Sequence, residues 1–375
     1  MKIKYPDYDR SVLSISSSIL AHYGIKPFHK TLPELDRLLG KNFKNVVMMI
    51  FDGMGSSILK NHLDDHAFLR AHKLADISSV FPPTTTASTV SMYTGLSPVE
   101  HGWLGWSLYF KEIDKNVNVF PNTLAGTEKT PATDFDVGLR YIPFGNIFDR
   151  ISARNADVQA ELIAPFVDGR INSTQVSSMP EIFGAVQQKC NEAGRHFLMT
   201  YWHNPDTEMH VHGTQSETAQ AIICDIDRQL AEMSERLADT LVIITADHGQ
   251  IDTEYRYITD FPASSECLAR PRSIEARAAN FFVKPDKKDQ FEMEFNRHFG
   301  ENFILLTKSK VIERKLFGEG VPHKKVDNFL GDYLAVATGK VSLDNARPTW
   351  RDVYKGQHAE LTEDEMTVPL IIIEK

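Results

Sequence analysis

Short, strongly apolar runs alternate with polar and amphipathic stretches along most of the chain. Such runs are typical of strands that are buried on both faces, as in a mainly parallel sheet. Residues 214–237 carry apolar side chains such as Ile222, Ile226 and Leu230 at helical spacing, which predicts an amphipathic helix. The alternation predicts an α/β fold, a doubly wound, mainly parallel sheet with helices on both faces. The predicted strands are 46–51, 197–202, 241–246, 279–283, 303–307, 332–338 and 368–373.

Two regions depart from this alternation. Residues 107–145 are rich in Asn, Thr, Pro and aromatic residues, and we expect long loops over one end of the sheet. Residues 251–355 mix short apolar runs with turns, which predicts a small cap or an extension of the sheet. Because no linker-like segment separates either region, we expect residues 1–375 to form a single α/β domain that carries 251–355 as an insertion.

The composition narrows the class of protein. With 375 residues, of which 42% are hydrophobic and 24% charged, the chain is large enough to bury its own core. Its net charge of −9 and the lack of a dense basic run argue against a nucleic-acid polymer as partner. The three cysteines, Cys190, Cys224 and Cys267, are too sparse for a disulfide framework.

The start of the chain is polar and has no apolar segment of the kind that a signal peptide carries. No run approaches the roughly 18 apolar residues that a membrane span requires. We therefore expect a cytoplasmic protein that has no membrane partner.

Candidate chemistry follows three of the predicted strands. Asp52 follows 46–51, Asp206 and His210 follow 197–202, and Asp247 and His248 follow 241–246. In open α/β sheets, ligands bind beyond the carboxyl ends of the strands, so these side chains are expected at one edge. Taken singly, an Asp-Gly after a strand is ordinarily a turn, and an isolated Asp-His-Gly is ordinarily a loop. Three such ends together favour a metal site.

Carboxylates and imidazoles without a ligating cysteine suit Zn²⁺, with Mn²⁺ as the alternative. Because there are more than four candidate ligands, we expect two divalent ions rather than one. Two ions about 4 Å apart stabilise both the attacking and the leaving oxygen of a phosphoryl transfer. The sequence therefore predicts a two-metal centre that acts on a phosphate ester.

A candidate nucleophile lies in residues 79–95, which are expected to contain a strand end, a proline break and the start of a helix. A threonine hydroxyl at this position could ligate a metal at the positive end of the helix, and both effects favour the alkoxide. The alternative is that Thr84, Thr85 and Thr86 only cap the helix. Spacing alone does not choose among the three threonines.

In combination and in order, these segments resemble the type I phosphodiesterase/nucleotide pyrophosphatase family of the alkaline phosphatase superfamily. The matching segments are IFDGMG (50–55), FPPTTTASTVSMYTGLSPVEHG (81–102), PDTEMH (205–210), TADHG (245–249) and GQH (356–358). The resemblance implies that Thr85, nine residues before Thr94, is the nucleophile. It also implies two ligand sets: Asp52, Asp247, His248 and Thr85 for one metal, and Asp206, His210 and His358 for the other.

The chain departs from this family at one position. Many family phosphodiesterases have an asparagine shortly after the His-Gly pair, which donates a hydrogen bond to a phosphoryl oxygen, whereas this chain has Trp106 there. The donor is therefore expected from a backbone N–H or from an Asn or Arg of residues 107–145. Trp103 and Trp106 could bind substrate by stacking on a base or sugar ring, and packing beneath the loop is the alternative.

The sequence thus predicts a metal-dependent hydrolase of phosphate esters that forms a phosphothreonine intermediate. A phosphodiesterase or nucleotide pyrophosphatase acting on a small molecule, with nucleotides among the candidates, is the first expectation. A phosphomonoesterase or phosphonate hydrolase of the same superfamily and a catalytically silent phosphate-binding protein are the alternatives. Neither the leaving group nor the oligomeric state follows from the sequence.

Overall fold

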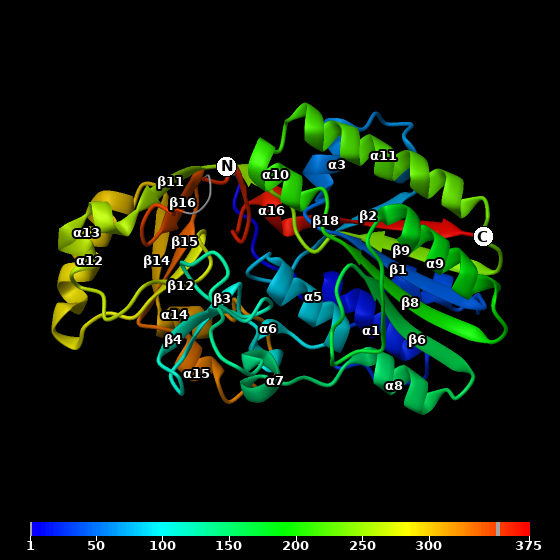
Figure 1. Cartoon of the computed structure of the whole chain (residues 1–375), viewed down its shortest axis with the longest axis horizontal. Helices are drawn as coiled ribbons and strands as arrows, with labels where there is room; N and C mark the ends of the chain where they lie inside the picture. The colour runs from blue at the N-terminus through cyan, green and yellow to red at the C-terminus, as the bar shows by residue number, and fades with distance from the viewer. Residues whose placement is uncertain (1, 350–352) are drawn as a thin grey trace.

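A seven-stranded, mainly parallel sheet forms the centre of one half of the molecule (Figure 1). The computed structural model describes residues 2–349 and 353–375. In spatial order the strands of this parallel sheet are β2 (Lys73–Ser78), β18 (Thr367–Glu374), β9 (Thr240–Thr245), β1 (Asn45–Phe51), β8 (Arg195–Trp202), β6 (Val158–Ala164) and β7 (Ser173–Gln175). The pairings from β9 to β7 are parallel, whereas β18 runs antiparallel to both of its neighbours.

Helices cover both faces of this sheet (Figure 1). The all-buried side chains of β1 and β9 account for their apolar sequences, because neither face of these strands reaches water. The predicted amphipathic helix is confirmed, with bounds Glu217–Ser234 and with Ile226 and Leu230 buried and Ile222 partly buried. One face is covered by α3 (Ser56–His62), α9 (Met179–Asn191) and α11 (Glu217–Ser234), and the other by α1 (Val12–His22), α5 (Thr85–Thr94) and α8 (Ile147–Arg154).

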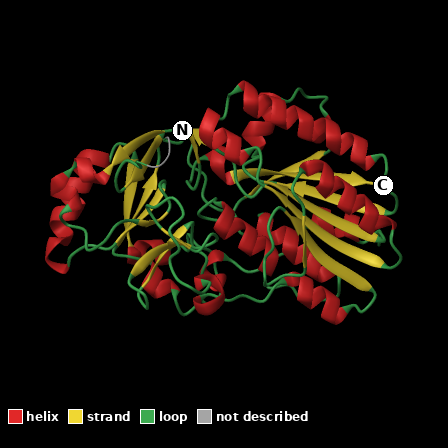
Figure 2. Cartoon of the chain, viewed as in Figure 1, coloured by secondary structure: helices red, strands yellow, loops and turns green. Residues whose placement is uncertain are grey.

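A second sheet forms the other half of the molecule, and all of its neighbouring strands are antiparallel (Figure 2). Its outer face packs on α13 (Lys288–Phe299) through a phenylalanine-rich core. In spatial order its strands are β14 (Phe303–Thr307), β15 (Tyr333–Ala337), β13 (Ala278–Phe281), β12 (Ser273–Ile274), β3 (Ser107–Phe110), β4 (Lys115–Asn118) and β5 (Thr123–Leu124).

The second sheet corrects two expectations. Three predicted strands, 279–283, 303–307 and 332–338, belong to this antiparallel sheet and not to the parallel one. Residues 107–145 are not only loops, since they contribute β3, β4, β5 and the helix α7 (Val137–Tyr141). Strands of a parallel or an antiparallel sheet can be buried on both faces when other layers cover the sheet. An apolar run therefore does not tell which kind of sheet a strand belongs to.

The rest of the chain joins the two sheets and carries several short elements. Two small ladders connect segments that are distant in sequence, the antiparallel β10 (Ile251–Asp252) with β17 (Gly356–Gln357) and the parallel β11 (Glu254–Tyr257) with β16 (Val341–Asp344). Among the residues that the structure describes, no helix combines the length and apolar character needed to cross a membrane. An α/β architecture with a mainly parallel sheet and helices on both faces is confirmed.

Candidate metal centre and active site

The carboxyl ends of β1, β8 and β9 bring their acidic and imidazole side chains together, as the sequence predicts. Because β1 pairs in parallel with both β8 and β9, the residues that follow these strands lie at one edge of the sheet. Asp52 follows β1, and Gly53 continues the turn with φ of 71°. A Cβ atom on Gly53 would lie 2.9 Å from the Cβ of Asp206, so the absence of a side chain allows the β8 end to approach.

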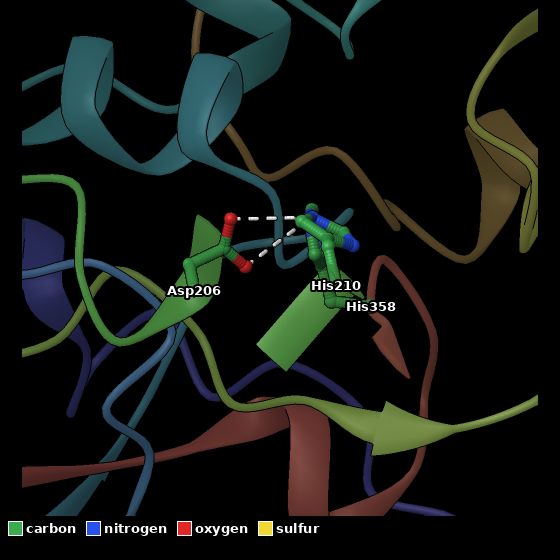
Figure 3. Close-up of side chains that lie close together, drawn as sticks. All are labelled: Asp206, His210 and His358. Atoms are coloured by element: carbon green, nitrogen blue, oxygen red, sulfur yellow. Dashed lines mark ion pairs between the residues drawn. The ribbon is translucent and has the colours of Figure 1, made fainter. Parts of the chain in front are cut away.

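One cluster consists of Asp206, His210 and His358 (Figure 3). Asp206 and His210 lie one helical turn apart on α10 (Asp206–His212), and the His210 Nε2 atom is 3.2 Å from Asp206 Oδ2. His358, which directly follows β17, places its Nε2 atom 3.9 Å from Asp206 Oδ1. The structure thus brings together the three residues that the family resemblance implies for one metal.

A second cluster consists of Asp52, Asp206 and His248. His248 Nε2 is 3.2 Å from Asp52 Oδ1 and 3.6 Å from Asp247 Oδ2. Asp247 is fully buried, and its Oδ1 atom accepts the backbone N–H groups of Gly53 and His248. Asp206 belongs to both clusters, so the two sets of candidate ligands adjoin one another.

The three imidazoles of these clusters have their Nδ1 atoms fixed by backbone carbonyl groups. His210 bonds to Gly356 O at 2.7 Å, His248 to Gly249 O at 3.0 Å, and His358 to Pro83 O at 3.1 Å. Because a carbonyl oxygen can only accept, the proton of each neutral ring lies on Nδ1. In a neutral ring each Nε2 atom therefore keeps its lone pair for a metal ion, and hydrogen bonds of this kind from the other ring nitrogen orient histidine ligands in metal sites.

Charge and burial act strongly on this group. Burial disfavours the imidazolium form of His248, but Asp247 and Asp52 outweigh it and raise the pKa of His248 to about 10. Burial and the charge of His248 hold the pKa of His358 well below its ordinary range. Burial and the neighbouring Asp52 raise the pKa of Asp247 well above its ordinary value. These opposed shifts show a dense cluster of acids and bases, which is the arrangement found at functional sites.

The residues present fit divalent metal ions. Asp206 Oδ1 and Asp247 Oδ2 are buried, and neither atom has a hydrogen-bond partner within the described part of the chain. Asp206 Oδ1 lies 3.9 Å from His358 Nε2, and Asp247 Oδ2 lies 3.6 Å from His248 Nε2. Oxygen and nitrogen ligands of this kind suit Zn²⁺ or Mn²⁺.

Thr85 is the threonine of the three that contacts these clusters. It is the first residue of α5, and its Oγ1 atom lies 3.2 Å from Asp52 Oδ2 and 3.3 Å from His248 Nε2. Thr84 instead donates its hydroxyl to Glu275 Oε1 at 2.7 Å, and Thr86 is fully buried. The geometry therefore distinguishes Thr85 where its sequence spacing did not.

A cavity of about 1070 Å³ opens over Thr85 and both clusters, between the parallel sheet and the second sheet. Trp106, which is 41% exposed, lines this cavity, and its backbone N–H donates to Glu275 Oε1. Trp103 does not line it. The Trp103 ring is fully buried, packs against Phe120 and Phe144, and donates its indole N–H to Ile142 O. The predicted stacking of Trp103 on substrate is therefore wrong, because the indole is part of the core.

Several residues at the site were not singled out from the sequence. Tyr201, inside β8, donates its hydroxyl to Asp52 Oδ2. Glu275 reaches the start of α5 from the second sheet, next to Ile274, whose φ is 69°. Asp168 and Arg170 lie in the loop after β6, which ends at the same edge as β8. The Asp168-Gly169 pair, which repeats the Asp52-Gly53 pair after β1, was the available signal for the β6 loop.

Comparison with known proteins identifies the family of this chain. The sequence profile described as type I phosphodiesterase / nucleotide pyrophosphatase matches residues 46–347. The chain belongs to this family. The match confirms the resemblance that the sequence motifs indicated. The family consists of phosphoric ester hydrolases. No curated protein sequence matches the chain.

Solved structures share the fold of this family member. Murine ectonucleotide pyrophosphatase / phosphodiesterase 5 superposes with a TM-score of 0.66 at 17% identity, covering 88% of each chain. An inactive variant of that protein in complex with AMP gives a TM-score of 0.65 at 17% identity, covering 88% of this chain and 87% of that one. Phosphonoacetate hydrolase from Sinorhizobium meliloti in complex with phosphonoformate gives 0.62 at 17% identity, covering 87% and 89%.

Proposed function

We propose that the protein is a two-metal hydrolase of small phosphate esters that forms a phosphothreonine intermediate on Thr85. The observation that carries the proposal is the position of Thr85 Oγ1, which lies 3.2 Å from Asp52 and 3.3 Å from His248 at the start of a helix. Family membership supplies the reaction class. The proposed ligands are Asp52, Asp247, His248 and Thr85 for one ion and Asp206, His210 and His358 for the other.

When bound, two divalent ions, which we expect to be Zn²⁺, supply positive charge that stabilises the oxygens of the phosphoryl and leaving groups. The chain itself positions the reacting atoms. Thr85 presents its hydroxyl toward the Asp52 carboxylate, so that its proton faces a base as the oxygen attacks phosphorus in line. The bond from phosphorus to the leaving-group oxygen breaks in the same displacement, and water then cleaves the phosphothreonine and regenerates the Thr85 hydroxyl. The N-terminal end of α5 contributes a favourable dipole for the negative charge that develops there. Asp52 is oriented in turn by the Tyr201 hydroxyl.

A diester or pyrophosphate substrate is the first proposal, since murine ectonucleotide pyrophosphatase / phosphodiesterase 5 and its AMP complex share the fold. One observation favours a monoester or a phosphonate instead. Trp106 stands where many family phosphodiesterases have an asparagine donor, and the backbone N–H of Trp106 already donates to Glu275. Phosphonoacetate hydrolase shares the fold to a similar extent.

The test compares turnover of bis-p-nitrophenyl phosphate and p-nitrophenyl phosphate by protein loaded with Zn²⁺ or Mn²⁺, alongside metal analysis. Two metal equivalents and a preference for the diester support the first proposal. Two equivalents and a preference for the monoester support the alternative. A protein that binds no metal, or that binds two ions and cleaves neither ester, would contradict the hydrolase proposal for these substrates and favour the silent binder.

A further inference from the structure

The loop that follows β6 brings a rigid guanidinium group to the cavity wall. Arg170 donates from Nε and Nη2 to the two carboxylate oxygens of Asp168, at 2.7 and 3.1 Å. Its guanidinium carbon lies 4.9 Å from the ring centroids of both Trp103 and Phe144. The side chain is 12% exposed, and Arg170 lines the cavity. Two of its nitrogens are thus committed to Asp168, and the stacked rings fix its plane.

One donor of this group remains unused. The Arg170 Nη1 atom is buried and has no acceptor among residues 2–349 and 353–375. A buried donor without a partner is unfavourable, and this cost is recovered when an acceptor arrives. The Asp168 carboxylate is engaged by Arg170 itself, so it does not compete for that remaining nitrogen.

A second unused donor lies on the helix that carries the proposed nucleophile. Thr85, Thr89 and Tyr93 follow one another at four-residue spacing on α5, and all three line the cavity. Long helical side chains point back toward the N-terminus, so the Tyr93 ring runs toward Thr85. Tyr93 is 1% exposed, and its hydroxyl has no hydrogen-bond partner in the described part of the chain.

The charges of the Asp168–Arg170 pair and of two proposed metal ligands act on the Tyr93 phenol. Burial raises the pKa of Tyr93, the charges of Asp168, Asp247 and Asp52 act in the same direction, and Arg170 opposes them. The phenol is therefore neutral and remains a donor. Tyr93, Asp168 and Arg170 also line the same cavity as Thr85, so the phenol and the guanidinium group can meet one ligand.

We propose that Tyr93 and Arg170 form a subsite that binds a hydrogen-bond-accepting oxygen on the group esterified to phosphorus. The inference rests on the proposed function, because it assumes that the phosphoryl group lies at Thr85. The oxygen can be anionic, as in a carboxylate or a second phosphate, or neutral, as in a hydroxyl group. A site built from buried donors rejects a ligand that lacks the acceptor, because its donors then stay unpaired. Substrates with a purely hydrocarbon substituent are accordingly disfavoured.

The experiment uses three matched esters and the whole metal-loaded protein: phenyl phosphate, 4-carboxyphenyl phosphate and 4-(hydroxymethyl)phenyl phosphate. We expect kcat/KM to favour at least one acceptor-bearing ester over phenyl phosphate by about tenfold, the equivalent of one net hydrogen bond. The carboxylate arm and the hydroxymethyl arm distinguish an anionic from a neutral ligand. Thermal shifts produced by the corresponding non-hydrolysable phosphonates report the same preference without turnover.

Tyr93→Phe is the decisive variant, because Arg170→Gln also deprives Asp168 of its partner. Tyr93→Phe should reduce the preference ratio, in kcat/KM and in thermal shift, by about threefold or more. Tyr257→Phe is the matched control, since Tyr257 also has a buried hydroxyl without a partner among the described residues but does not line the cavity. It should leave the ratio unchanged.

Two outcomes would overturn the subsite: the wild-type protein shows no preference in either assay, or Tyr93→Phe preserves the preference in full. Absence of turnover for all three monoesters and for bis-p-nitrophenyl phosphate, with the phosphonate preference intact, would contradict the proposed hydrolase function and leave the subsite supported.

Discussion

The imidazole rings of His248 and His358 stack with their centroids 3.7 Å apart and their planes 18° from parallel. One ring follows β9 in the parallel sheet, and the other arrives from the β17 segment much later in the chain. Two positive charges at this separation would repel strongly, and burial would add to the cost. At most one of the two rings therefore carries a charge, in agreement with the raised pKa of His248 and the lowered pKa of His358.

Metal removal should destabilise the protein. Dialysis against a chelator is expected to lower the melting temperature, because ions that bind only the folded state add about 2.7 kcal/mol each at a concentration of 100 times Kd. Calorimetry of the treated protein, followed by titration with Zn²⁺ or Mn²⁺, measures the loss and its recovery. An unchanged melting temperature together with undetectable metal would argue against the two-ion centre.

Loss of the Thr85 hydroxyl should abolish turnover and leave the fold intact. Thr85→Ala is expected to lower kcat by about 10³-fold or more, as removal of a covalent nucleophile does in other hydrolases. Metal content should change little, because six other ligands remain. Thr86→Val, at a buried neighbouring threonine outside the cluster, is the control. Near-wild-type turnover by Thr85→Ala would eliminate the phosphothreonine intermediate.

Glu275 should act as a positioning residue through its two hydrogen bonds. Its Oε1 atom accepts from Thr84 Oγ1 and from the Trp106 N–H, both at 2.7 Å. Glu275→Ala leaves both donors unpaired, at about 1–3 kcal/mol for the buried Thr84 hydroxyl, and we expect about a tenfold lower kcat. Glu275→Gln keeps an acceptor oxygen and should retain most activity. Equal losses in the two variants, measured as separate kcat and KM values, would indicate that the charge matters instead.

Gly53 should be needed for metal binding in particular. A Cβ there would lie 2.9 Å from Asp206 Cβ, whereas one on Gly24, which also has a positive φ, would meet only Arg154 Nε at 3.9 Å. Both Gly53→Ala and Gly24→Ala should cost about 1–2 kcal/mol of stability from the left-handed backbone. Only Gly53→Ala is expected to weaken metal affinity, by about tenfold or more, in calorimetric titration. Equal affinities would show that Asp206 adjusts without loss.

His101 should make stability depend on pH. The Trp103 N–H donates to its Nδ1 atom, and Nε2 lies 3.0 Å from Ser91 Oγ. Burial lowers the pKa of His101 from 6.5 to about 3. Since the unfolded state then binds more protons between pH 6.5 and about 3, the free energy of unfolding falls as pH falls through that window, by up to about 1.4 kcal/mol per pH unit.

The measurement is urea unfolding between pH 7 and 4. The amide oxygen of the asparagine in His101→Asn can accept the same N–H. This variant should reduce the slope of the free energy of unfolding against pH by up to the equivalent of about one bound proton. The same substitution at the exposed His66 should not. Parallel curves for the wild type and His101→Asn would contradict the assignment.

The strand ends were predictable from the sequence, because β1, β8 and β9 are mostly apolar and an acid or an imidazole follows each of them within two residues. The end of β6 was missed for a physical reason. This strand carries the exposed Gln159 and the acidic Glu161, which is satisfied by Thr174 and Lys189. Its sequence therefore lacks the continuous apolar run that marks the other strands. For this reason β6 was not predicted as a strand, and the residues after it were not predicted as part of the site.

Other parts of the site depend on contacts between distant segments. His358 follows a two-residue strand whose register is fixed by β10, so no local periodicity marks it, and only the resemblance to the family indicated it. Glu275 reaches Thr84 from the second sheet, and that sheet could not be distinguished from an extension of the first. Trp103 was instead predicted to contact substrate and lies in the core. A large aromatic side chain near a motif can pack in the core as readily as it can bind substrate, and the sequence does not distinguish the two.

The position of β18 has a consequence for biosynthesis. This strand lies between β9 and β2, yet the ribosome makes it after every other strand of that sheet, and His358 precedes it by only a few residues. A growing chain that stops short of this point exposes two unpaired strand edges, which are prone to associate with other chains. It also lacks one imidazole of the centre. Closure of the sheet and completion of the metal centre are thus tied to the same late step of synthesis, and a prematurely terminated chain would have neither.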